Sequence, residues 1–269
     1  MVMPKVSLVM ATYNDQPEYL IMAIDSIIQQ SFKDWELIIV DDSDDTNTID
    51  TIDKYSEKDG RVRVIRNKEK KYGFVPALNA GLELAQGKYV GRMDGDDVSY
   101  PQRLEKEVGF LEEHQNVDVV GTQTAIIDEY GNKTSEIKFP SNGLKFRLFQ
   151  MIRCPMQHGT ILMRRSLIDK GIRYDDSFKR SEDLELWLRL QKQGYQLYNI
   201  QEILYDFRIE AGYAKKRSRI HFKYNMKARQ GNINRRHPIT SICGLMISCC
   251  YFLIPSNVKG MVYKVLNGR

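Results

Sequence analysis

Three aspartates within four residues, Asp94, Asp96 and Asp97, are the clearest chemical signal in this 269-residue chain. They follow an apolar run, residues 89–93, that is typical of a short buried strand, and Gly95 allows a tight turn. Carboxylates this close repel one another, and Mg²⁺ or Mn²⁺ relieves the repulsion while also binding substrate phosphates. A solvated acidic turn is the alternative. The position favours a metal–phosphate site, because ligands of open α/β sheets lie at the carboxyl ends of strands.

The elements before this turn predict how it is positioned. Continuous apolar runs, typical of strands buried on both faces, occur at residues 6–10, 35–40 and 62–65. Apolar residues recur at helical spacing over residues 17–30, 49–56 and 76–85. The alternation predicts a Rossmann-like, mostly parallel α/β sheet flanked by helices. A second acidic segment, residues 41–45, follows the strand at 35–40, so two strands should bring carboxylates to one edge. The P-loop and G-x-G-x-x-G motifs are absent, which argues against P-loop enzymes and Rossmann dehydrogenases.

The second half of the chain has shorter and less regular patterns. We expect helices at residues 101–114, 144–151 and 182–193, with Ser181 capping the last of them. Strands are expected at residues 117–120, 124–127, 159–163, 196–199 and 203–209. No motif in residues 120–180 identifies a substrate.

Charge is distributed unevenly along the chain. After Glu210 there are twelve Lys and Arg residues and no Asp or Glu; removing these twelve from the total of 40 leaves 28 basic against 35 acidic residues in the remainder. An acidic body with a basic tail predicts an anionic partner surface. A membrane fits better than nucleic acid, because no nucleic-acid recognition motif accompanies the charge.

The tail also contains an uncharged stretch, residues 238–258. A helix over residues 239–254 would be about 24 Å long, shorter than the roughly 30 Å hydrocarbon core of a bilayer. We therefore expect a helix that lies in the membrane surface. Packing against the body or a second subunit is the alternative, and a homodimer could form through the tail. The first residues lead into a strand without a signal peptide, and the four cysteines lack zinc spacing, so we expect reduced thiols and a cytoplasmic location.

Six short motifs, in this order, resemble those of family 2 glycosyltransferases: residues 7–14, 39–43, 79–81, 87–90, 94–97 and 181–183. The resemblance covers roughly residues 4–210. It implies a GT-A fold and inversion at the anomeric centre of a nucleotide-activated sugar. It also implies a nucleotide-sugar-binding half at residues 1–115 and an acceptor-binding, catalytic half at residues 116–212 of one domain. Residues 213–269 would form a basic and apolar helical tail.

The resemblance implies nucleotide contacts at the first two strand ends. Thr12 and Tyr13 would contact the nucleotide, with Tyr13 stacking near the base. Asp41 would accept the uracil N–H, and Asp42 would lie near the ribose. The expected donor is therefore a UDP-sugar.

It also implies a metal and a base. Asp94 and Asp96 match the Asp-x-Asp pair, with Asp96 ligating Mn²⁺ or Mg²⁺ and Asp94 near the ribose or a metal-bound water. Asp97 would orient the turn. Asp183 matches the catalytic base, in the first turn of a helix whose dipole favours the ionised form. The alternative for Asp183 is an ordinary helix start, where acidic residues are common.

Four further residues have two interpretations each. His158 could contact acceptor or phosphate, or be a satisfied loop histidine; His221 could reach the metal or diphosphate, or be solvated. Lys71 and Arg92 could reach the diphosphate or belong to the many surface cations. Glu210 stands where many members of the family have a histidine, which weakens inferences about the acceptor side.

Together these patterns predict an inverting hexosyltransferase. It would use a UDP-sugar and a saccharide acceptor on polyprenyl diphosphate, at the cytoplasmic face of the plasma membrane, in bacterial O-antigen or capsule synthesis. The alternatives are a metal-dependent nucleotidyl- or phosphotransferase and a non-catalytic peripheral membrane module.

Overall fold

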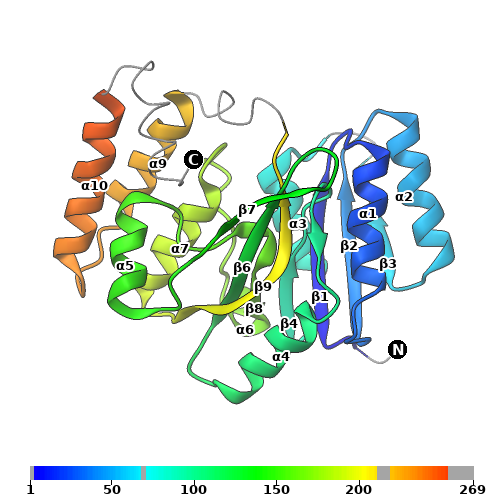
Figure 1. Cartoon of the computed structure of the whole chain (residues 1–269), viewed down its shortest axis with the longest axis horizontal. Coiled ribbons are helices and arrows are strands. Elements are labelled where there is room, and N and C mark those ends of the chain that lie inside the picture. Colours follow the sequence, from blue (N-terminus) through cyan, green and yellow to red (C-terminus); the bar gives the residue numbers. More distant parts are fainter. Residues whose placement is uncertain (1–2, 68–70, 211–218, 254–269) are drawn as a thin grey trace.

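The structure, a computed structural model, describes residues 3–67, 71–210 and 219–253 (Figure 1). One nine-stranded sheet runs in the order β3-β2-β1-β4-β8-β6-β9-β5, with β7 paired to β6. Its first half is parallel and comprises β1 (Val6–Thr12), β2 (Trp35–Asp41), β3 (Val62–Ile65) and β4 (Tyr89–Arg92). The helices that connect these strands are α1 (Pro17–Ile28), α2 (Thr46–Lys58) and α3 (Phe74–Leu84).

The continuous apolar runs are explained by two cores, one on each face of the sheet. In β2, Leu37 and Ile39 pack in the core beneath α1 and α2, whereas Ile38 and Val40 pack in the core beneath α3. Successive side chains of a strand point to opposite faces, so both faces demand apolar residues. The predicted parallel α/β arrangement is confirmed for this half.

The second half of the sheet contains both parallel and antiparallel strand pairs. Its strands are β5 (Val98–Ser99), β6 (Val119–Ile127), β7 (Lys133–Ile137), β8 (Leu162–Arg164) and β9 (Leu197–Arg208). Its helices are α4 (Arg103–Glu113), α5 (Gly143–Ile152), α6 (Arg165–Asp169) and α7 (Glu182–Gln193). β8 pairs antiparallel with β4 and β6, and so joins the two halves into one sheet.

Four predictions for this half were wrong. The strands expected at 117–120 and 124–127 form the single strand β6, and those at 196–199 and 203–209 form β9. These two strands pair in parallel with register shifts near Gln123, and such irregularities interrupt the side-chain alternation along the sequence. The expected strand at 159–163 begins instead with a 3₁₀ turn, His158–Thr160. Ser181 occupies the N-cap position of α7 with φ +58°, but its side chain caps no backbone N–H.

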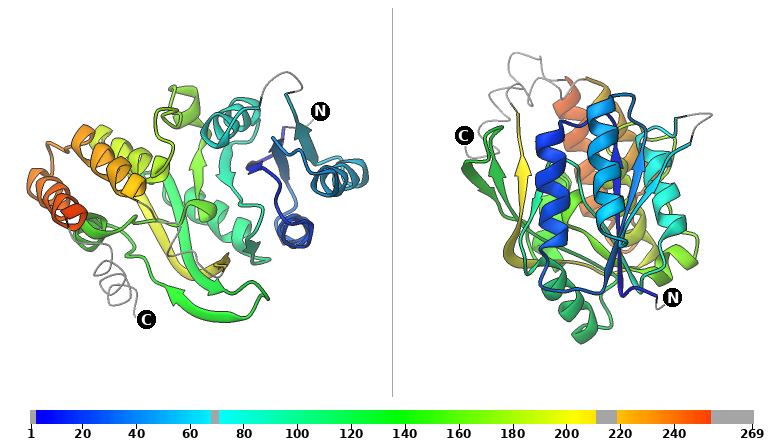
Figure 2. Two further views of the ribbon diagram at one scale, coloured as in Figure 1. Left: turned by 90° about the horizontal axis from the view of Figure 1, so that it is seen from above. Right: turned by 90° about the vertical axis from the view of Figure 1, so that its right-hand side faces the viewer.

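The tail helices pack against the body. α9 (Arg219–Gly231) contacts α7, and α10 (Pro238–Leu253) contacts both α9 and α5. Figure 2 shows them at the end of the molecule opposite α1 and α2. Within the described ranges, no helix is both long and apolar enough to cross a membrane. Residues 211–218 and 254–269, which include parts of the predicted tail segments, lie outside the described residues.

An exposed apolar face remains on the two helices of this end. It is formed by Leu144, Leu148 and Ile152 of α5 and by Ile239, Ile242 and Met246 of α10. We call this the α5–α10 face. The expected helix at 239–254 thus exists, and one of its sides packs on the body while another exposes large apolar side chains.

Candidate functional site

The site begins where β1 and β2 end side by side. The parallel register pairs Thr12 with Asp41, and the Thr12 hydroxyl donates to Asp41 Oδ1 over 3.0 Å. Arg66 Nε donates to Asp41 Oδ2 over 2.6 Å. Burial opposes ionisation of Asp41, but hydrogen bonds from Ser43 and Arg66 lower its pKa. Asp41 is therefore a buried, ionised carboxylate, and its expected contact with a uracil N–H stays a prediction.

Next to it, Asp42 shapes the loop that enters α3. Its two carboxylate oxygens accept the backbone N–H groups of Tyr72 and Gly73, over 3.0 and 2.6 Å. Gly73 has φ +78°, a conformation that favours glycine. Tyr13 is 58% exposed, with Lys71 Nζ 4.4 Å from its ring centroid. The exposed ring leaves a stacking surface beside a cation, and Lys71 also pairs with Asp44.

The turn after β4 is anchored by Arg92 and Asp97. Arg92 Nη1 donates to Asp94 Oδ2 over 2.8 Å, and a second contact joins the same two groups. Burial alone would lower the pKa of Arg92, but Asp94 raises it. Asp97 is fully buried, and its Oδ1 accepts the backbone N–H of Arg208 over 2.8 Å. The turn is thus tied to β9, and Arg92 is not a surface cation.

A fourth carboxylate, Asp15, joins this cluster. A Cβ added at Gly95 would lie 2.5 Å from Asp15 Oδ2, so Asp15 packs directly on the turn. Burial, followed by Asp96 and Asp94, raises the pKa of Asp15 to about 7. Burial and Asp94 raise the pKa of Asp96 to about 6. We did not predict Asp15 from the sequence, although its place in the loop after β1 was a usable signal.

This cluster fits a cation that is shared with a substrate. Among the described residues, no three His, Cys, Asp or Glu side chains are arranged to hold a metal by themselves. Mg²⁺ commonly takes one or two carboxylates and completes its shell with water and phosphate oxygens. Arg92 already neutralises Asp94, whereas Asp96 has a raised pKa that a cation would lower.

Asp183 lies in the first turn of α7. Its Oδ1 accepts the backbone N–H of Leu184 over 2.7 Å, and its Oδ2 lies 3.2 Å from Cys154 Sγ. Burial and Asp183 raise the pKa of the Cys154 thiol well above its ordinary value, so the protonated thiol donates to the carboxylate. Burial, then Asp183, raises the pKa of the neighbouring Glu182 to about 7. Cys154 and Glu182 are further residues of the site that sequence reasoning missed.

Tyr174 lies between the Asp94 turn and the start of α7. Burial raises its pKa, and so do the charges of Asp94 and Asp183. Its hydroxyl lies 2.7 Å from His158 Nε2. Burial and Arg92 lower the pKa of His158 well below its ordinary value, so the ring is neutral. The structure therefore brings the turn of Asp94 and the helix start of Asp183 into one region, and His158 is a satisfied buried histidine within it.

The other sequence candidates lie elsewhere. His221 is partly buried on α9, and Glu210 accepts from Gln16 Nε2 over 3.5 Å beyond the end of β9.

The raised pKa of Asp15 leads to a prediction about stability. An acid whose pKa rises from about 3.9 when unfolded to about 7 when folded holds its proton more tightly in the folded state. Its contribution to stability is therefore lost as pH rises between these values. The ligand-free protein should have a smaller free energy of unfolding at pH 7 than at pH 5. Asp15→Asn should reduce that difference by on the order of 1 kcal/mol.

Urea titrations at the two pH values measure this difference. Asp50→Asn, an exposed change on α2, is the matched control and should leave the pH dependence unaltered. If the free energy of unfolding depends on pH equally in wild type and Asp15→Asn, folding does not raise the pKa of Asp15.

Comparison with known proteins identifies the family. A family model described as glycosyl transferase family 2 matches residues 7–172, more than half of the chain. The chain is a family 2 glycosyltransferase. Its relatives include EpsE of Bacillus subtilis (strain 168), named as a glycosyltransferase, at 40% identity over 220 residues, which are 80% of this chain and 77% of EpsE. The O-antigen biosynthesis glycosyltransferase WbnJ of Escherichia coli is 28% identical over 261 residues, 96% and 98% of the two chains.

Solved structures confirm the fold of this glycosyltransferase. S. aureus TarS 1–349 in complex with UDP-GlcNAc superposes with a TM-score of 0.70 at 19% identity, over 90% of this chain and 70% of that chain. Against the longer TarS structure, the match covers 94% of this chain and 44% of that chain. Identity this low supports the fold alone. The expected GT-A arrangement is thereby confirmed.

Proposed function

We propose that this glycosyltransferase moves a hexose from a UDP-sugar to a hydroxyl of a saccharide acceptor, with inversion at the anomeric centre. The observation that carries the proposal is that the turn of Asp94 and Asp96, on which Asp15 packs, lies close to the start of α7. A Cβ added at Gly159 would lie 2.9 Å from Asp94 Oδ2, and the adjacent His158 Nδ1 lies 4.0 Å from Oε1 of Glu182, the residue before Asp183. Departure of a nucleoside diphosphate needs positive charge at one end of the site, and attack by a hydroxyl needs a base at the other. A cation held by the aspartate cluster would supply the positive charge, and Asp183 would be the base.

The nucleotide would bind over the ends of β1 and β2. Tyr13 offers an exposed ring for stacking, and Lys71 beside it offers a charge for phosphate. Thr12 and Asp42 support the loops that form this surface. Asp41, already hydrogen-bonded to Thr12 and Arg66, is the acceptor that we assign to the base.

Asp96 would hold Mn²⁺ or Mg²⁺, with Asp94 beside it and still paired to Arg92. When bound, such an ion stabilises the negative charge on the leaving diphosphate. The protein's own contribution is positional, because Asp97 fixes the turn through the backbone of Arg208.

Asp183 would remove the proton from the acceptor hydroxyl during its attack. The N–H of Leu184 and the thiol of Cys154 donate to its two oxygens, which fixes the orientation of the carboxylate. Asp183 also lies in the first turn of α7, where the positive end of the helix dipole stabilises negative charge.

The acceptor that we propose is a saccharide on polyprenyl diphosphate at the cytoplasmic face of the plasma membrane. Relatives named for O-antigen and amylovoran biosynthesis, WbnJ and AmsE of Erwinia amylovora, support an envelope polysaccharide. The α5–α10 face, together with a tail that has no acidic residue after Glu210, supports contact with an anionic bilayer.

Donor specificity and catalysis are tested together. We expect purified protein to hydrolyse one UDP-sugar of a panel slowly, only with Mn²⁺ or Mg²⁺, and to transfer its sugar when acceptor is present. Release of phosphate or diphosphate without sugar transfer would contradict the proposal and favour a phosphotransferase or nucleotidyltransferase.

Membrane contact gives a separate prediction. Replacing Leu148 and Met246, which are 47% and 61% exposed, by Gln should weaken co-sedimentation with anionic vesicles by about tenfold or more, because each apolar side chain that enters the bilayer contributes about 1.5–3 kcal/mol. The control is Tyr130→Gln, which changes a side chain that is 81% exposed on the loop between β6 and β7. Unchanged vesicle binding by the double variant, together with conversion of a dimer to a monomer in light scattering, would reassign this face to self-association.

A further inference from the structure

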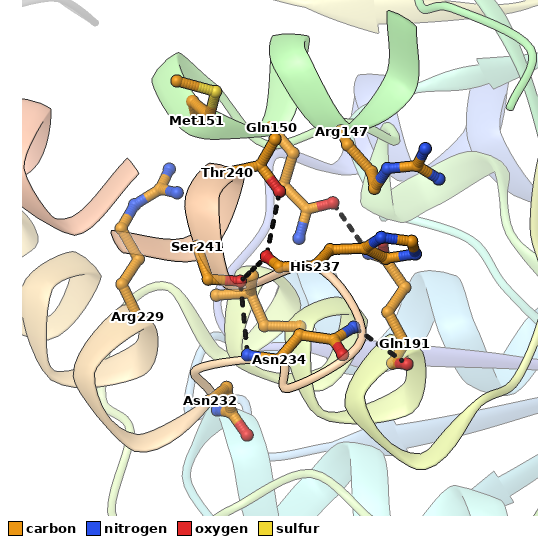
Figure 3. Close-up of a pocket in the computed structure, with 11 residues that line it drawn as sticks. Arg147, Gln150, Met151, Gln191, Arg229, Asn232, Asn234, His237, Thr240 and Ser241 are labelled. Carbon is orange, nitrogen blue, oxygen red and sulfur yellow. Dashed lines mark hydrogen bonds between the residues drawn. The ribbon is translucent and has the colours of Figure 1, made fainter. Parts of the chain in front are cut away.

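A pocket of about 30 Å³ lies where α5, α7, α9 and α10 meet, apart from the carboxylate cluster. Figure 3 shows Arg229 on one side of it and Arg147 and His237 on the other. The remaining lining is mainly polar, with side-chain amides of Gln150 and Asn234 among it. Within the described part of the chain, neither Asp nor Glu lines this pocket. We call it the Arg229 pocket.

Arg229 is a buried cation for which the described residues provide no counter-ion. It is 4% exposed, Nε donates to Asn225 Oδ1 over 2.8 Å, and among the described residues Nη2 has no hydrogen-bond partner. Two other buried arginines differ in this respect: Arg92 pairs with Asp94, and Arg103 pairs with Glu107. Burying an unpaired charge is unfavourable, and burial lowers the pKa of Arg229 to about 10.

The surroundings of the guanidinium increase its need for an anion. A Cβ added at Gly244 would lie 2.9 Å from Arg229 Nη1 and 3.2 Å from Met151 Cα, so α10 closes over the guanidinium where it meets α5. Burial, followed by Arg147 and Arg236, lowers the pKa of His237 on the pocket wall. The Arg229 pocket is thus a region of uncompensated positive charge with amide side chains on its wall.

We propose that the Arg229 pocket binds a phosphate group. Guanidinium groups bind phosphate through two parallel N–H···O bonds, and here Nη2 is free to donate. Two of the helices that line the pocket, α5 and α10, also expose the apolar α5–α10 face. A phosphate ester of a lipid would satisfy both features, and free phosphate would satisfy the first. The proposal does not depend on the transfer reaction, because its site and that of Asp96 are separate.

Thermal unfolding in phosphate, against chloride at matched ionic strength, tests the site with inorganic phosphate as the probe. At about tenfold above the Kd, phosphate should raise the Tm of the wild type by about 4 °C. Arg229→Met should have an equal or higher Tm without phosphate, because it removes an unpaired buried charge, and its Tm should not rise with phosphate. Arg229→Lys, which keeps the charge, should retain part of the rise.

The controls separate this pocket from other cations and from the proposed donor site. Arg235→Met removes an exposed charge nearby and should respond to phosphate like the wild type. UDP binding should be unchanged in Arg229→Met. An equal rise in Tm for wild type and Arg229→Met would overturn the proposal, whatever the outcome of transfer assays.

Vesicles then identify the source of the phosphate. If a lipid supplies it, the wild type should bind phosphatidate-containing phosphatidylcholine vesicles about tenfold more tightly than Arg229→Met does, and inorganic phosphate should compete. If both proteins bind the vesicles equally while only the wild type is stabilised by inorganic phosphate, the ligand is free phosphate.

Discussion

Asp183→Asn should lower the rate of sugar transfer by about 10²- to 10⁴-fold, the contribution typical of a positioned general base, and leave UDP binding unchanged. The amide cannot accept the proton of the attacking hydroxyl, but it preserves the shape of the carboxylate. Its contacts with Leu184 and Cys154 are on the acceptor side of the proposed site, away from the nucleotide surface at Tyr13. The measurement is kcat with saturating donor, beside UDP affinity by calorimetry.

Two further variants sharpen this result. Glu182→Gln changes the neighbouring acid, whose pKa is raised to about 7, and should retain most of the activity if Asp183 is the base. Asp169→Asn at the end of α6 is an exposed control. Full turnover by Asp183→Asn would remove it as the base, and loss of activity in Glu182→Gln alone would transfer that role to Glu182.

Asp96→Asn should weaken metal-dependent UDP binding by about 10²- to 10³-fold, because it removes the carboxylate that we assign to the cation. The same change should make the ligand-free protein more stable at pH 7. Burial and Asp94 raise the pKa of Asp96 to about 6, so the stability that its protonated form contributes is lost as pH rises from about 3.9 to about 6, and is absent at pH 7. A variant that becomes more stable while it loses ligand binding indicates that the replaced side chain lowers stability and serves binding.

Calorimetric titration of UDP with and without Mn²⁺, beside urea unfolding, measures both effects. Asp50→Asn should change neither. Metal-dependent UDP binding of wild-type strength in Asp96→Asn would contradict the assignment of this residue, and lowered stability would contradict the raised pKa.

The parallel first half of the sheet was predictable, because the sequence pattern of each strand agrees with the burial that the complete sheet requires. The runs that became β1, β2 and β4 are mostly apolar because both faces of the sheet are covered, and parallel pairing then places Asp41 and Asp94 at one edge. The motif order carried the family assignment, which the comparison confirmed.

Other features depend on contacts between residues far apart in the sequence. Register shifts near Gln123 divide the pattern of β6, although the chain continues as one strand. Asp15 was not predicted as a site residue, because its pKa is raised only when folding buries it and brings Asp96 close to it. Cys154 is 29 residues from Asp183, and no spacing rule links a thiol to a carboxylate across that interval.

The bond between Asp97 and the backbone of Arg208 limits how this enzyme can be divided. Residues 1–115 hold every proposed nucleotide contact, yet the carboxylate of Asp97 is completely buried and its partner is supplied from 111 residues further along the chain. A fragment that stops before β9 would leave this acid without its donor and release the turn that carries Asp96. Chimaeras that exchange acceptor preference between relatives should therefore keep residues 197–208 from the same parent as the aspartate turn.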